Sequence, residues 1–124
     1  MILCLFSCNS GKVSNVSIKE FESTLYTTEE IEAAINVAID YFKKEFSGCT
    51  LNEITYAGDE MAKKETEYYA AEDGDEVIVL ISEFDVDSSG GDGSLNPNST
   101  YKGWKWILVR SNAGEWRHLT HGYG

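Results

Sequence analysis

Residues 28–46 read TEEIEAAINVAIDYFKKEF, and this stretch decides the fold. Its apolar residues recur every three or four positions, which is the spacing of one helix face; they are Ile31, Ala34, Ile35, Ala38, Ile39, Phe42 and Phe46. Thr27 and Glu30 have the spacing of a capping box, and Gly48 supplies a stop. A stripe this wide has to lie on a sheet or another helix, so it indicates a core element.

The segments after this helix are rich in β-forming residues and are separated by turns. They predict strands over residues 50–57, 76–86, 101–110 and 115–123, and a short second helix from 59 to 69 or 71. Residues 76–86 begin with apolar side chains on both faces, which predicts a central strand covered on both sides. Two helices and hairpin-linked strands indicate an α+β fold, with both helices packed on one face of a curved antiparallel sheet.

The length and the charge limit the classes of function. A chain of 124 residues fits one domain. It carries 10 basic and 21 acidic side chains, and this net charge of −11 opposes binding to nucleic acid. Residues 59–92 are the most acidic part of the chain. They form either a solvated face that keeps the domain soluble or a surface for a cation or a basic partner.

The first residues resemble a processing signal. Residues 1–8 read MILCLFSC, in which LFSC is similar to a bacterial lipobox ending at Cys8, and residues 9–15 are polar, like a tether. The apolar stretch is short and has no preceding Lys or Arg, as expected if the start were assigned too late. We expect Cys8 to carry a lipid, residues 1–15 to lie outside the core, and residues 16–124 to form a single domain. We also expect an extracytoplasmic location, in which the lipid on Cys8 is the protein's contact with the membrane. The alternative is a frayed terminus with two incidental cysteines.

A longer pattern resembles a known group of proteins. Residues 84–101 read FDVDSSGGDGSLNPNSTY, residues 104–110 read WKWILVR, and residues 114–116 read GEW. With the long helix before them, they resemble uncharacterised lipoproteins, chiefly of Gram-positive gut bacteria, whose domain is similar to the cystatin-like, nuclear transport factor two-like superfamily. The resemblance covers roughly residues 20–124 and implies a cone-shaped sheet. That superfamily includes isomerases, dehydratases and binding modules, so the fold implies little about function.

Three tryptophans lie within 13 positions, on two strands joined by a hairpin. Such a cluster usually fills a core. In a cone-shaped fold, an aromatic cluster at the open end can also line a small-molecule pocket, with a tyrosine and a histidine as its polar groups. The candidate ligand-binding residues are Tyr56, Trp104, Trp106, Trp116 and His118.

The same cone suggests an enzyme as the alternative. An isomerase-like site needs a general base and hydrogen-bond donors among apolar side chains. Tyr56 and His118 are candidate donors, and Glu83 or Asp85 is the candidate base, but both acids lie beside a long loop. We assign no catalytic residue and expect a binding or interaction module for a small molecule or a protein. The alternative is a small isomerase- or dehydratase-like enzyme, and self-association into a homodimer is left open.

Two groupings raise the question of metal binding. Asp85, Asp87 and Ser89 alternate like the opening of a calcium loop, with Asp92 as a further ligand, but Asn96 stands where the twelfth position needs Glu. We expect no cofactor here, with weak calcium binding as the alternative. His118 and His121 are three residues apart, which places them on opposite faces of a regular strand and argues against a metal pair.

Overall fold

The computed structural model describes residues 10–72, 74–91 and 93–123. Over these residues the chain forms, in order, β1 (Ser17–Ile18), α2 (Thr28–Glu45), β2 (Cys49–Tyr56), α3 (Asp59–Tyr69), β3 (Asp75–Val86), β4 (Thr100–Ser111) and β5 (Arg117–Gly122). The α+β class and the predicted order of elements from the long helix onward are confirmed. The two-residue β1 was not predicted.

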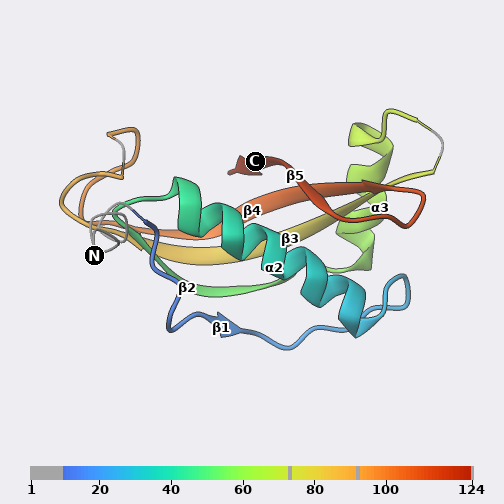
Figure 1. Cartoon of the computed structure of the whole chain (residues 1–124), viewed down its shortest axis with the longest axis horizontal. Coiled ribbons are helices and arrows are strands. Elements are labelled where there is room, and N and C mark those ends of the chain that lie inside the picture. Colours follow the sequence, from blue (N-terminus) through green and yellow to red (C-terminus); the bar gives the residue numbers. More distant parts are fainter. Residues whose placement is uncertain (1–9, 73, 92, 124) are drawn as a thin grey trace, which may run out of the picture.

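The five strands form one open sheet in chain order, from β1 at one edge to β5 at the other (Figure 1). β1 runs parallel to β2, whereas every other neighbouring pair is antiparallel. The prediction of a purely antiparallel sheet was therefore wrong, because the chain follows the edge of β2 before it enters α2. β3 is central as predicted, and Val77, Ile78, Val79 and Leu80 are all fully buried.

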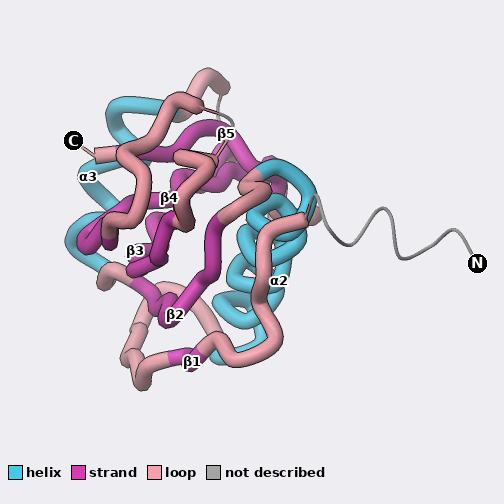
Figure 2. Tube along the Cα trace, turned by 90° about the vertical axis from the view of Figure 1, so that its left-hand side faces the viewer, coloured by secondary structure: helices cyan, strands magenta, loops and turns pink. Residues whose placement is uncertain are grey.

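The helix α2 begins with the predicted capping box. The Glu30 N–H donates to Thr27 Oγ1 at 3.1 Å, and the Thr27 N–H donates to Glu30 Oε1 at 2.8 Å. The helix α2 lies along one face of the sheet (Figure 2), and its apolar stripe packs on Ile78, Leu80 and Trp106. Each large apolar side chain buried there contributes about 1.5–3 kcal/mol.

The short helix α3 covers the opposite face of the sheet. Met61 and Tyr69 pack against Val77 and Val79, and the Val77 N–H donates to the Thr66 hydroxyl at 3.1 Å. Figure 2 shows the strands between the two helices. The prediction that both helices lie on one face was wrong, because β3 carries apolar side chains on both faces and each face needs a cover.

The chain before β1 is packed against the domain from residue 11 onward. The Gly11 N–H donates to the Lys43 carbonyl at the end of α2 at 2.9 Å. Gly11 is buried, and a Cβ at this position would overlap the carbonyl oxygen of Phe42. This part of the predicted tether is therefore in contact with α2.

The next residue continues this contact along β2. The Lys12 N–H donates to the Cys49 carbonyl, and the Leu51 N–H donates to the Lys12 carbonyl, both at 2.9 Å. Residues 1–9, including Cys8, lie outside the described residues. None of the described helices is long and apolar enough to cross a membrane.

Candidate functional site

A partly open cavity of about 230 Å³ lies where the end of α2 meets the loop after β3 and the strands β4 and β5. Its lining combines aromatic, polar and loop residues, namely Tyr41, Glu45, Phe46, Ser47, Cys49, Gly91, Ser94, Leu95, Trp104 and His121. This volume lies below the roughly 300–1,000 Å³ of common ligand pockets, so a molecule that fits inside is small.

The loop of residues 87–99 is held against the turn between α2 and β2. The Asp87 N–H donates to the Gly48 carbonyl at 2.9 Å, and the Asn98 N–H donates to the Asp87 carbonyl at 3.0 Å. Gly48 has φ +77°, and a Cβ there would lie 2.5 Å from Ser89 Oγ. This close approach places the loop where it can form one wall of the cavity.

Trp104 on β4 is the largest side chain in the cavity wall, and it is 9% exposed. Its ring meets Phe46 edge to face at 6.2 Å and stacks on His121 at 5.8 Å. The indole Nε1 is buried and has no hydrogen-bond partner among the residues that the structure describes. A buried donor without a partner costs about 1–3 kcal/mol.

His121 reaches the cavity because the last strand is irregular. The register of β4 and β5 shifts between Ile107 and Leu108, which leaves Leu119 as an extra residue in β5. This β-bulge turns His118 and His121 to the same face, and His118 Nε2 lies 3.0 Å from His121 Nδ1. The prediction that the two histidines lie on opposite faces was therefore wrong.

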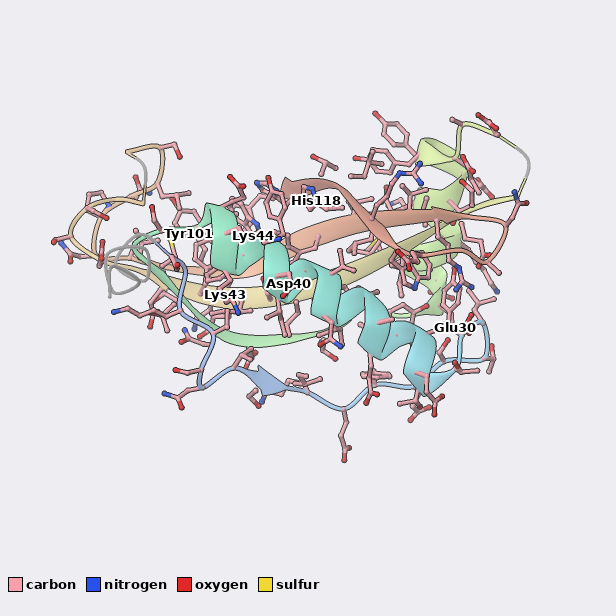
Figure 3. All side chains as sticks on the ribbon, in the orientation of Figure 1. Glu30, Asp40, Lys43, Lys44, Tyr101 and His118 are labelled. Atoms are coloured by element: carbon pink, nitrogen blue, oxygen red, sulfur yellow. The ribbon has the colours of Figure 1, made fainter. Side chains whose placement is uncertain are left out.

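The histidine pair packs against the end of α2. The imidazole of His118 stacks on Tyr41 at 3.8 Å with 12° between the planes, and Figure 3 shows His118 beside α2. Burial, and secondly the charge of His121, lowers the pKa of His118, and burial lowers the pKa of His121. Both imidazoles are therefore uncharged at neutral pH, and one donates a hydrogen bond to the other.

Trp106 lies beneath the cavity in the core. It is fully buried, and its Nε1 donates to Ser82 Oγ at 2.8 Å. The Ser82 hydroxyl donates in turn to the Trp104 carbonyl at 3.2 Å. Trp106 therefore supports Trp104 from below and does not line the cavity.

Trp116 belongs to a separate cluster at the other end of α2, where Figure 3 places Glu30 away from His118. Its Nε1 donates to the Glu30 carbonyl at 3.1 Å, and the Arg110 guanidinium lies 4.5 Å above its ring. Arg110 Nη2 donates to Glu30 Oε2 at 2.7 Å and to Glu76 Oε1 at 3.0 Å. This cluster joins α2 to β3 and β4.

Tyr56 lies at the end of β2 and anchors the chain that leads into α2. Its hydroxyl donates to Asp59 Oδ1 at 2.6 Å, and Asp59 also accepts bonds from the Ser23 hydroxyl and the Thr24 N–H. These hydrogen bonds, of which the one from Ser23 has the largest effect, hold the pKa of Asp59 far below its usual range. Burial, followed by the bond to Asp59, raises the pKa of Tyr56.

The five predicted ligand-binding residues therefore do not form one pocket. Trp104 lines the cavity, and His118 adjoins it through His121. Sequence reasoning missed Tyr41, Glu45, Phe46 and Cys49 as lining residues, and it placed His121 on the face opposite His118. The spacing of four between Tyr41 and Glu45 placed them on one helix face, but no sequence pattern located the bulge that brings His121 to them.

The predicted calcium ligands are bonded to other groups. Asp85 Oδ1 accepts from the Thr100 hydroxyl at 2.6 Å, and Asp87 Oδ1 accepts from the Ser89 N–H at 2.8 Å and from the Ser89 hydroxyl at 2.5 Å. The hydrogen bonds from Ser89 lower the pKa of Asp87. Asp92 lies outside the described residues. Elsewhere in the described chain, no group of three or more His, Cys, Asp or Glu side chains is placed to hold a metal ion.

Comparisons of the chain with protein families, with curated proteins and with solved structures find no match.

Proposed function

We propose that this domain is a binding module that holds a small molecule in the cavity between α2, the loop of residues 87–99, β4 and β5. The observation that carries this proposal is the lining of the cavity, in which the rings of Tyr41, Phe46 and Trp104 lie beside Glu45 and His121. Ligand pockets commonly combine apolar and aromatic walls with a few placed polar groups. Here the polar side chains of the lining include His121 and Glu45.

The enzyme alternative has less support. An isomerase-like reaction needs a carboxylate enclosed next to a tyrosine or histidine. Glu45, the carboxylate in the wall of the cavity, is exposed. Asp85 is bonded to Thr100, and Tyr56 is bonded to Asp59. Binding without chemistry therefore fits the arrangement best.

The proposal has two further parts, one supported by the sequence and one by the packing of α2. The lipobox-like LFSC at residues 5–8 supports an extracytoplasmic domain anchored by lipid on Cys8. The long helix laid on one face of the sheet supports a cystatin-like, nuclear transport factor two-like architecture. Lipidation is tested by the mass of the full chain recovered from bacterial membranes. We expect added acyl mass and membrane partitioning, both lost in Cys8→Ser.

Binding is tested by screening small polar fragments against the ¹⁵N-labelled full chain. We expect some fragments to shift the indole N–H signal of Trp104, which is assigned by its loss in Trp104→Phe. Trp116→Phe is the matched control, because Trp116 lies outside the cavity and its indole is bonded to Glu30. Fragments that shift the Trp116 indole signal in place of that of Trp104, or no shift of Trp104 with any fragment, would overturn the proposal.

A further inference from the structure

The contact between His118 and His121 brings two metal-ligating nitrogens together at the edge of the sheet. His118 Nε2 lies 3.0 Å from His121 Nδ1, and both residues are partly exposed on β5. Imidazole nitrogens are ligands that suit zinc, copper and nickel ions. In a tetrahedral zinc site with Zn–N bonds of about 2.0–2.1 Å, two ligand nitrogens lie about 3.3 Å apart. The two histidines are therefore close to the spacing at which both nitrogens bind one ion.

The fold holds the two rings in this position. The β-bulge at Leu119 turns both side chains to the same face, so the backbone does not have to change for the two nitrogens to meet. The ring of Tyr41 stacks on His118 at 3.8 Å, and the ring of Trp106 lies 5.2 Å from that of His121. Ligands that packing has already placed lose less freedom when an ion binds, so this arrangement favours chelation.

The ligand atoms, and not the local charge, define this site. Glu45 lines the same cavity as His121, but Lys43 and Lys44 lie in the same last turn of α2 and offset its charge. Neutral nitrogen ligands favour transition-metal ions over calcium and magnesium, which prefer oxygen. Within the described ranges, no third His, Cys, Asp or Glu side chain joins the pair in a metal-binding group. Water therefore fills the other coordination positions.

We propose that His118 and His121 together bind one divalent transition-metal ion, His118 through Nε2 and His121 through Nδ1. In the metal-free chain, one of these two nitrogens carries the proton of their hydrogen bond. Metal binding needs a lone pair on both, so that nitrogen gives its proton to solvent and the other nitrogen of the same ring takes one up. Both rings stay neutral and no net proton is released. The inference does not depend on the proposed binding of a small molecule, because the ion needs only the two imidazoles.

The test uses zinc as the probe and the tautomers of the two imidazoles as the readout. Zn²⁺ is titrated into the ¹⁵N-labelled full chain, and the ring nitrogens of both histidines are followed by NMR. With zinc bound, we expect the ring protons on Nδ1 of His118 and on Nε2 of His121. In the metal-free chain, one of the two rings should have the opposite tautomer. Zinc that shifts one ring only, or that leaves both tautomers unchanged, would overturn the proposal.

Single variants test whether one ion binds both rings. His118→Phe and His121→Phe should each weaken zinc binding at the remaining imidazole by at least about tenfold, because the two ligands no longer act together. Cys4→Ser/Cys8→Ser is the control for thiol binding, and it should leave the zinc titration of both imidazoles unchanged. Unchanged zinc affinity in both histidine variants would show that the rings bind independently and would overturn the proposal. Fragment binding at Trp104 is measured without zinc, so the failure of one proposal is distinguishable from the failure of the other.

Discussion

His118 and His121 are joined through their imidazole rings, Nε2 to Nδ1 at 3.0 Å, although they stand three residues apart in an edge strand. The extra residue Leu119 makes this contact geometrically possible, because it cancels the alternation of a regular strand. The pair places one imidazole on Tyr41 and the other in the wall of the cavity beside Trp104. The edge of the sheet is thereby built into the candidate site.

The pair predicts a pH dependence of stability. Both histidines have a folded-state pKa below the usual value of 6.5. As the pH falls through about 6.5, the unfolded chain therefore binds protons that the folded chain does not. The free energy of unfolding should accordingly fall between pH 7.5 and 5.5, as measured by urea denaturation.

The variant His118→Phe/His121→Phe tests this assignment. It keeps two rings next to Tyr41 and removes both groups that titrate. We expect the free energy of unfolding of this variant to be nearly constant over the same pH range. A pH dependence as steep as that of the parent chain would assign the effect to other groups.

The packing of Gly11 predicts that the chain before β1 contributes to stability. Gly11→Ala should cost about 1–3 kcal/mol, because the new methyl group would overlap the Phe42 carbonyl and its ring. The exposed Ser14 gives a matched control, and Ser14→Ala should change the free energy of unfolding by less than about 0.5 kcal/mol. Equal stabilities of the two variants in urea would show that the segment is a free tether.

Arg110 is the buried cation whose loss should be most costly. Its side chain is 8% exposed and binds Glu30 and Glu76, which are about one-third exposed. Arg110→Met should cost about 1–3 kcal/mol, because both partly exposed carboxylates lose their partner and Trp116 loses the guanidinium above its ring. Arg117→Met, at an exposed position on β5, should cost less than about 0.5 kcal/mol. Thermal unfolding of both variants measures these costs. A loss of stability below about 1 kcal/mol in Arg110→Met would contradict the conclusion that Arg110 joins α2 to β3 and β4.

The loop of residues 87–99 should bind calcium weakly or not at all. Asp85 and Asp87 already accept hydrogen bonds from Thr100 and Ser89, and Asn96 offers no carboxylate to close a calcium loop. Isothermal titration of the metal-stripped full chain should therefore give a dissociation constant no tighter than about 10⁻⁴ M. Micromolar binding that is abolished by Asp87→Ala would make calcium a ligand of this loop.

Local patterns predicted most of the fold. The capping box at Thr27 and the periodicity of α2 fixed the first helix, and the two-faced apolar start of β3 identified the central strand. The same two-faced pattern called for a helix on each face, which the predicted one-sided packing overlooked. The other failures depended on contacts distant in sequence. No local signal places Gly11 beside Lys43 or pairs β1 with β2, because these contacts form only after α2 has folded onto the sheet.

Less of the candidate site than of the fold was predicted from the sequence. Trp104 was found from its aromatic strand, but Trp106 and Trp116 share its residue type and serve the core and a separate cluster. Alternation predicts which face a side chain takes only in a regular strand, so a bulge at Leu119 reversed the expectation for His121. Register is set by pairing across strands, which a single sequence does not reveal.

The most direct test of the central claim is the nuclear Overhauser spectrum of the full chain with a fragment that shifts the Trp104 indole signal. The cavity between α2 and β4 predicts intermolecular contacts from the fragment protons to the ring protons of Trp104 and Phe46, and none to Trp116 at the far end of the helix. Contacts to Trp116 in place of Trp104, or no intermolecular contact at a fragment concentration that saturates the observed shift, would contradict the account.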